Sequence, residues 1–193
     1  MREATIAAVD EGIGSIRELS MIVIMAGLPG TGKSTLAQAL ARRLSGSVLD
    51  KDIIRAALFQ PAHVEYSLVQ DDFCQEIMLQ IAAYLQDKDA EHWVLLDGRT
   101  FSRRYQRQRV IEFCSQVRTD WAVLECVCGE QTALGRLTEA LTVKTHLAAN
   151  RTPELYREIR EAWEPIDEPK LIIDTDANID SCVDQALRYL TTK

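Results

Sequence analysis

The sequence contains no apolar run close to the length of about 18 residues that a membrane helix needs. Its first twenty residues carry four acidic side chains and lack the apolar core of a secretory signal. We therefore expect a cytoplasmic protein with no membrane partner. Disulfides are not expected either, because the five cysteines are an odd number without the spacing of a disulfide framework.

Histidine is also scarce, with three scattered residues. Cys126 and Cys128 would share one face of a strand, but these histidines offer them no obvious partners for a metal site. We interpret both cysteines as small core residues.

Positive charge is in the minority, with 22 Lys and Arg against 29 Asp and Glu, a net charge of −7. Such a balance disfavours a broad surface for long nucleic acid or for anionic membranes. A localised basic groove is still compatible with it. The 193 residues suit about one domain with an ordinary core.

From residue 21 onward, short apolar runs alternate with longer amphipathic segments. This rhythm predicts an α/β fold, a five-stranded and mostly parallel sheet flanked by helices. The predicted strands are 21–26, 47–49, 93–96, 121–128 and 170–173. The predicted helices lie near 34–45, 52–59, 66–87, 102–118, 130–142, 153–163 and 178–191.

Residues 1–20 do not follow this rhythm, so we predict an N-terminal extension, 1–20, ahead of one domain, 21–193. Apolar residues recur in the extension at helical spacing, and two glycines weaken that pattern. It could dock on the domain or on a partner, but a frayed extension is the preferred interpretation.

A phosphate-binding loop is the strongest motif. It reads Gly27-Leu28-Pro29-Gly30-Thr31-Gly32-Lys33-Ser34 and fits the pattern G-x-x-x-x-G-K-S/T between a predicted strand and a predicted helix. Glycines allow backbone N–H groups to point at phosphate oxygens, and the helix start adds a positive dipole end. Lys33 would reach the β and γ phosphates, and the Ser34 hydroxyl would bind Mg²⁺.

The end of the second predicted strand carries Asp50-Lys51-Asp52 and, one helical turn on, Arg55. Strand ends line the ligand crevice of a parallel sheet, so Asp52 would face the γ-phosphate across a gap suited to an acceptor. There it could take the proton of an acceptor hydroxyl, while Arg55 binds the acceptor. The alternative is that Asp52 caps the helix that follows it.

The third predicted strand ends at Asp97, a candidate for holding Mg²⁺ through its water shell; the alternative is an Asp that starts a turn with Gly98. A dense group of arginines follows: Arg99, Arg103, Arg104, Arg107 and Arg109. They indicate either an anionic group on the acceptor, with Arg99 and Arg104 binding it, or an exposed helix face rich in arginine.

The segment after the fourth predicted strand could form a basic lid that excludes water and adds positive charge near the transferring group. Arg136, Lys144 and Arg151 are its candidates. A guanine-specific switch would carry Asn-Lys-x-Asp, which this sequence lacks, and a large ATPase motor would need a longer chain.

Over residues 21–190 the chain resembles the small P-loop kinases of the predicted-kinase group, related to polynucleotide kinase, chloramphenicol phosphotransferase and the zeta toxins. The loop with Thr35 added is similar to the family's own loop, and Asp50-Lys51-Asp52-Ile53-Ile54-Arg55 looks like its element with a catalytic base. Looser similarities are Leu96-Asp97-Gly98-Arg99-Thr100-Phe101, the stretch from Arg151 to Pro165, and Ile172-Ile173-Asp174-Thr175.

This resemblance implies a fold like the nucleoside monophosphate kinases, with ATP and Mg²⁺ as cofactors, and phosphoryl transfer to a hydroxyl. It also implies that Arg136 covers the adenine or the phosphates and that the loop after Asp174 and Thr175 lies near the base. The family often has a second lid arginine where this chain has Ala140, so Arg151 or Lys144 would have to replace it.

The sequence thus predicts an ATP-dependent kinase that acts on a hydroxyl of a small-molecule or nucleotide-like acceptor. Two alternatives stay open, a 5′-hydroxyl kinase on nucleic acid and a non-catalytic module that binds nucleotide. Neither the acceptor nor the oligomeric state follows from the sequence.

Overall fold

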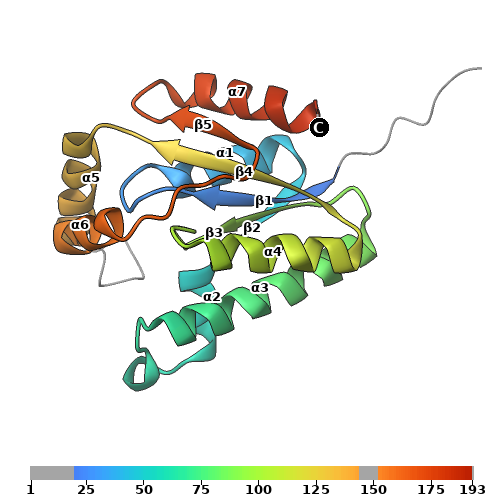
Figure 1. Cartoon of the computed structure of the whole chain (residues 1–193), viewed down its shortest axis with the longest axis horizontal. Coiled ribbons are helices and arrows are strands. Elements are labelled where there is room, and N and C mark those ends of the chain that lie inside the picture. The colour runs from blue at the N-terminus through green and yellow to red at the C-terminus, as the bar shows by residue number, and fades with distance from the viewer. Residues whose placement is uncertain (1–19, 144–151, 193) are drawn as a thin grey trace, which may run out of the picture.

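A computed structural model describes residues 20–143 and 152–192 of the chain (Figure 1). Five strands form one parallel sheet in the order β2-β3-β1-β4-β5. The strands are β1 (Met21–Ala26), β2 (Gly46–Asp50), β3 (Trp93–Asp97), β4 (Asp120–Val127) and β5 (Lys170–Asp174). The predicted fold class is confirmed, and each strand end lies within one residue of its expected place.

Seven α-helices and one short 3₁₀ helix lie between and after these strands in the described part of the chain. They are α1 (Lys33–Arg43), α2 (Lys51–Leu58), η1 (Pro61–His63), α3 (Leu68–Lys88), α4 (Arg104–Val117), α5 (Glu130–Val143), α6 (Pro153–Glu161) and α7 (Ile179–Thr191). All seven predicted helices are present, with ends within two residues of the expected ones. The predicted extension lies, apart from Ser20, outside the described residues.

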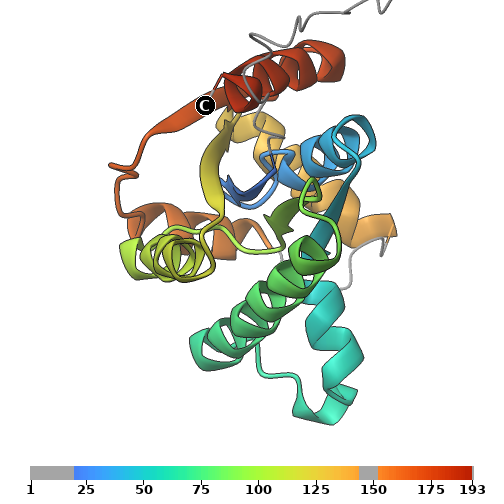
Figure 2. The ribbon, with the colours of Figure 1, turned by 90° about the vertical axis from the view of Figure 1, so that its right-hand side faces the viewer.

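The central strand β1 is fully buried, because helices cover both faces of the sheet (Figure 2). Met21, Val23 and Met25 pack with apolar side chains of α1 and α7 on one face. Ile22 and Ile24 pack with those of α3 and α4 on the other face. A run of apolar residues without polar alternation is typical of such a doubly covered parallel strand.

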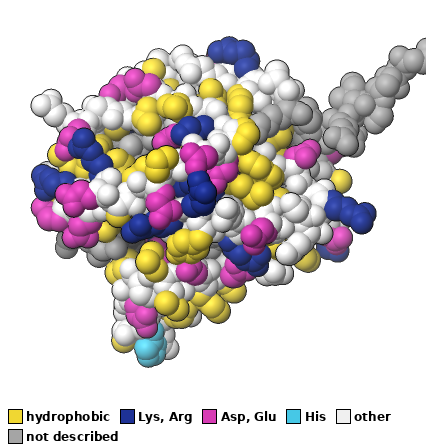
Figure 3. Space-filling model, in the orientation of Figure 1, with side chains coloured by type: hydrophobic (Ala, Val, Ile, Leu, Met, Phe, Trp, Pro, Cys, Tyr) yellow, Lys and Arg dark blue, Asp and Glu magenta, His cyan; other side chains and the backbone are white. Residues whose placement is uncertain are grey.

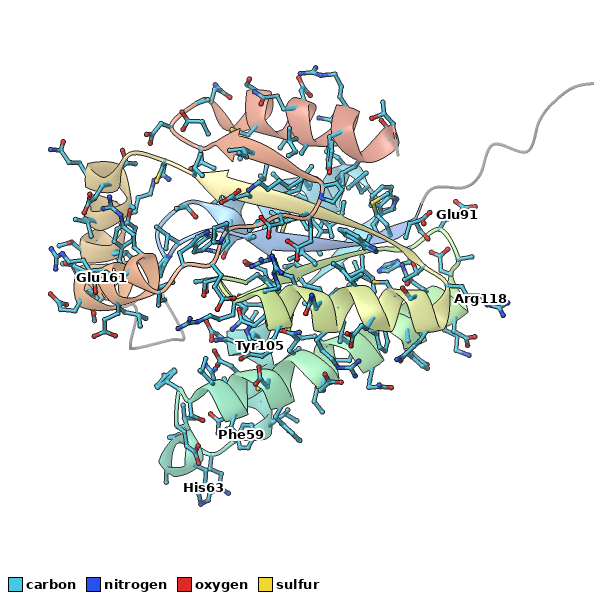
Figure 4. The ribbon with its side chains drawn as sticks, in the orientation of Figure 1. Phe59, His63, Glu91, Tyr105, Arg118 and Glu161 are labelled. Atoms are coloured by element: carbon cyan, nitrogen blue, oxygen red, sulfur yellow. The ribbon has the colours of Figure 1, made fainter. Side chains whose placement is uncertain are left out.

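The carboxyl ends of the strands point toward α5 and α6, as the arrowheads in Figure 1 show. Ala133 and Leu137 of α5 and Tyr156 of α6 form a small separate cluster there, with Leu28 of the phosphate-binding loop packed against it. The ligand crevice of a parallel sheet lies at this edge. Glu91 and Arg118 mark the opposite edge (Figure 4).

All five cysteines are free thiols. Cys126 is buried at the end of β4, and burial raises the pKa of its thiol to about 12. Cys128 lies one residue beyond that strand and is half-buried. Within residues 20–143 and 152–192, no group of three or more His, Cys, Asp or Glu side chains could hold a metal ion. No helix in those ranges is long and apolar enough to cross a membrane.

Candidate active site

The loop between β1 and α1 has the backbone that phosphate binding requires. Gly27, Gly30 and Gly32 all have positive φ angles of 140°, 79° and 77°. A Cβ at Gly30 would lie 2.5 Å from the carbonyl oxygen of Ala133, so α5 can approach the loop closely only because this residue is glycine. The loop is therefore fixed from outside by the helix that covers it.

Lys33 is the first residue of α1, and its side chain folds back over the loop. Its ammonium group donates hydrogen bonds of 2.8 Å to the Gly27 carbonyl and 2.7 Å to the Leu28 carbonyl. Only 6% of the residue is exposed. The loop thus holds a buried cation beside its own amides, an arrangement suited to an anionic tail of phosphates.

Arg136 of α5 closes the other side of the loop. Its guanidinium donates to the Thr175 carbonyl at 2.9 Å, the Thr175 hydroxyl at 3.1 Å and the Gly30 carbonyl at 3.4 Å. Thr175 in turn donates its hydroxyl to the Thr31 carbonyl at 2.9 Å. One arginine therefore ties together the loop, α5 and the turn after β5.

A cavity of about 340 Å³ opens beside these contacts. Its lining is Gly30, Gly32, Lys33, Ser34, Thr35, Arg136, Leu137 and Ala140. The cavity thereby brings together six of the twelve residues predicted to bind the cofactor. Asp174 is not among them, because its exposed carboxylate accepts the backbone amide of Asp176 at 2.9 Å. Lys144 and Arg151 lie outside the described residues.

Asp50, and not Asp52, caps helix α2. The Asp50 carboxylate accepts the amides of Asp52 at 2.7 Å and Ile53 at 3.4 Å. The interpretation of Asp52 as the helix cap is therefore wrong, because it required a helix that begins at residue 53, whereas α2 begins at Lys51. The Asp52 side chain is instead 5% exposed and lines a cavity.

Asp52 belongs to a buried network of four charges. Its Oδ1 accepts from Arg55 at 2.7 Å and lies 3.3 Å from the Lys51 ammonium. Both Lys51 and Arg55 also pair with Asp71 of α3, Lys51 at 2.9 Å. Burial lowers the pKa of Lys51 to about 8, although the neighbouring Asp52 opposes this shift. Arg55 thus orients Asp52 directly.

Asp97 lies beside Asp50 in the register of β2 and β3 and is 1% exposed. Its Oδ1 is buried and has no hydrogen-bond partner among the described residues. A buried carboxylate oxygen without a partner is costly unless a cation or water satisfies it. The Asp97 carboxylate is therefore buried and not at the surface, and its oxygen is of the hard type that Mg²⁺ prefers.

The arginines after β3 are mostly structural. Arg103 pairs with Glu164, Arg104 with Asp167, Arg107 with Glu168, and Arg109 with Glu76. Arg99 donates to Gln75 at 2.7 Å and to Asp72 at 2.5 Å. Tyr105 lies beside this pair, between α4 and α3 (Figure 4). Of the three arginines predicted to bind substrate, Arg99 lines the cavity beside Lys33 and Asp52, whereas Arg55 and Arg104 are not in its lining.

A second cavity, of about 400 Å³, lies between the loop, α2, α3 and α6. Lys33 and Asp52 both line it, so the cation at the phosphate-binding loop and the buried carboxylate face one space. We call it the acceptor-side cavity. The remaining lining is Pro29, Lys51, Tyr66, Leu68, Asp71, Gly98, Arg99, Thr100, Ser102, Arg103, Gln106, Leu155, Glu158, Ile159 and Ala162.

A family model described as an AAA domain matches residues 22–140, which is more than half of the chain. The chain belongs to this AAA domain family. The match includes the phosphate-binding loop, Asp52, Asp97 and Arg136, and it ends before α6.

Solved structures share the fold of this AAA domain protein. An APS kinase (CysC) of Mycobacterium tuberculosis, in complex with AMPPNP and APS, matches with TM-score 0.68 and 20% identity over 91% of this chain and 99% of that one. A gluconokinase of Sinorhizobium meliloti matches with TM-score 0.66 and 16% identity over 91% and 94%. Kti12 of Chaetomium thermophilum, in complex with ADP-AlF3, matches with TM-score 0.63 and 16% identity over 88% and 98%.

Sequence reasoning missed two residues of this AAA domain site, Lys51 and Asp71. The only signal for Lys51 was its place between two aspartates at the end of a strand. No signal existed for Asp71, because it comes from the first turn of α3, 20 residues away from Lys51.

Proposed function

We propose that the protein is an ATP-dependent phosphotransferase that moves the γ-phosphoryl group of ATP to a hydroxyl group of an acceptor. The observation that carries this proposal is the acceptor-side cavity, because Lys33 and Asp52 line it together. A triphosphate seated in the loop would present its terminal phosphate to this space. A hydroxyl placed beside Asp52 would then lie opposite that phosphate.

Asp52 is the proposed base. The acceptor O–H passes its proton to the Asp52 carboxylate as the acceptor oxygen bonds to the γ-phosphorus, and the bond from that phosphorus to the bridging oxygen of ADP breaks. Arg55 holds the carboxylate in place from behind, with its guanidinium 2.7 Å from Oδ1. A pre-oriented base costs no reorganisation when the reaction occurs.

In this proposal, ATP is bound by the backbone amides of the loop, by Lys33 and by Arg136. Lys33 supplies positive charge to the β and γ phosphates, and Arg136 lies over the entrance between the loop and Thr175. Ser34 and Asp97 are the residues that would hold Mg²⁺. When bound, the metal supplies charge that neutralises the phosphate oxygens.

The comparisons support this function without identifying the acceptor. Two of the three similar structures named above are described as kinases, and one of these is a complex with AMPPNP, an ATP analogue. Their acceptor substrates carry different chemistry, as the names APS kinase and gluconokinase indicate. The donor half is therefore the part that similarity supports.

The test is mass spectrometry of a metabolite and oligonucleotide mixture incubated with the full chain and Mg-ATP. We expect one compound to gain a phosphate, and Lys33→Ala to lower that rate about 10²–10³-fold by removing preorganised charge. If ATP binds tightly and no compound gains a phosphate, the protein is a nucleotide-dependent binding module. If only an oligonucleotide 5′ end is labelled, it is a polynucleotide kinase.

A further inference from the structure

Apart from Lys33, which serves the phosphates in the proposed function, the cations at the acceptor-side cavity are paired with carboxylates of the protein. Lys51, Arg99 and Arg103 line the cavity, and Arg55 contacts it through its pairs with Asp52 and Asp71. Each of them pairs with a carboxylate, and the carboxylates are Asp52, Asp71, Asp72 and Glu164. Four positive charges thus face four negative ones.

The Arg55–Asp52 pair is the most deeply buried, with side chains 3% and 5% exposed. Arg99 is also 3% exposed, whereas its partner Asp72 is 46% exposed, and both members of the Arg103–Glu164 pair are partly exposed. An anionic acceptor would have to take a guanidinium away from its own carboxylate and leave that carboxylate without a partner. Breaking a buried pair in this way is strongly unfavourable.

The residues that α6 and its C-terminal end contribute to the cavity lining are mostly apolar and include no cation. Leu155 and Ile159 of α6 and Ala162, the C-cap that follows it, line the cavity together with Pro29. Glu158, the remaining charged residue that α6 contributes to the lining, is exposed and acidic. The negative charge of Glu158 therefore repels an anionic acceptor.

Building on the proposed function, we infer that the acceptor is a compact, uncharged alcohol or polyol with one apolar face, and not a compound that bears phosphate, sulfate or carboxylate. Hydroxyl groups can donate to carboxylates and accept from ammonium or guanidinium groups without disturbing the charge balance. The apolar face would pack against α6. The volume of about 400 Å³ is near the lower end for small-molecule sites.

A first experiment measures phosphoryl transfer to matched acceptors that differ by one anionic group. Suitable pairs are nucleosides with their 3′-monophosphates, and sugars with their sugar acids. We expect the uncharged member of a productive pair to be preferred by about 10²-fold or more in kcat/KM, because the anionic member must displace a carboxylate of the protein from its cation. Equal use of both members, or preference for the anionic one, would overturn the inference and leave the kinase proposal intact.

A second experiment tests the cavity without a known acceptor. The full chain is saturated with Mg-AMPPNP, so that the loop is filled, and inorganic sulfate is titrated by calorimetry. We expect no saturable binding to the wild type. We expect saturable binding to Asp72→Asn, which releases Arg99 at the cavity. The matched control is Asp167→Asn, which releases Arg104 away from the cavity and should bind no sulfate.

Sulfate binding to the AMPPNP-loaded wild type would refute an uncharged acceptor. Failure of Asp72→Asn to gain binding would also refute it, because carboxylate pairing would then not be what excludes anions. If no acceptor of any kind is phosphorylated, the proposed function fails, whereas the sulfate measurement still decides the charge class of the cavity.

Discussion

The Asp50 carboxylate accepts the backbone amide of Asp52 at 2.7 Å. One aspartate thus caps α2, and the other is left to face the acceptor-side cavity. The two carboxylates are only two residues apart, yet the first serves the fold and the second serves the proposed chemistry. Substitutions at position 52 can therefore test catalysis without removing the helix cap.

Asp52→Asn should lower phosphoryl transfer by about 10²–10⁴-fold, because an amide cannot take the acceptor proton. Affinity for Mg-AMPPNP should change little, since Asp52 lies on the acceptor side of Lys33. Steady-state kinetics and calorimetry measure the two quantities. Asp87→Asn, an exposed change at the end of α3, is the control. Wild-type turnover by the Asp52 variant would remove this residue from the mechanism.

Arg136→Ala should weaken Mg-AMPPNP binding by about 10- to 100-fold, since a hydrogen bond to a charged group contributes about 1.5–3 kcal/mol. The variant loses the guanidinium that joins the loop to Thr175. Calorimetry gives the dissociation constant. The matched control is Arg160→Ala on α6, whose partner is Glu130. Equal increases of the dissociation constant in both variants would show that Arg136 acts only through the packing of α5 and α6, and not through the nucleotide.

Gly98→Ala should destabilise the fold by about 1–3 kcal/mol, because the residue has a positive φ of 79° and an added Cβ would lie 2.4 Å from the Asp50 carboxylate. Gly135→Ala in α5 has open space around it and should stabilise by up to about 1 kcal/mol. Urea unfolding measures both free energies. An unchanged free energy of unfolding for Gly98→Ala would mean that the Asp50 side chain, which caps α2, can move aside without cost.

Lys51 should make the stability of the fold depend on pH in the alkaline range. Its pKa is lowered to about 8 in the folded state from 10.5. Between these values the unfolded chain binds the extra proton, so the contribution of Lys51 to the free energy of unfolding rises with pH. Below pH 8 the residue is charged in both states, and the contribution stays constant.

The comparison of wild type with Lys51→Met isolates this effect. The free energy of unfolding of the wild type, relative to the variant, should increase from about pH 8 to about pH 10. Urea unfolding at a series of pH values measures it. A constant difference over this range would show that Lys51 keeps an ordinary pKa.

The sequence was sufficient for the features that local spacing determines. The loop from Gly27 to Ser34 and the doubly buried strand before it follow from short-range patterns. Asp97 was found for the same reason, because a carboxylate directly after an apolar strand lies at the crevice edge. The roles of these residues in catalysis are still predictions.

Partners that come from distant elements could not be read from the sequence. Arg99 pairs with Asp72, 27 residues earlier, and Arg107 with Glu168, 61 residues later. Spacing does not say which carboxylate meets which arginine once the chain has folded. From the sequence, the arginine-rich stretch therefore indicated either an anionic acceptor or an exposed helix face, whereas in the folded chain these arginines pair with acidic residues.

The wall formed by Leu155 and Ile159 belongs to a nine-residue helix beyond the segment that the family model matches. Its other side carries Tyr156, which packs with α5 near the loop (Figure 3 shows the surface over these helices at the left). Substitutions on the cavity side of this helix can reshape one half of the crevice and spare the other. Changes on the cavity side of α6 could therefore alter which acceptor a related protein uses, while its nucleotide-binding loop stays the same.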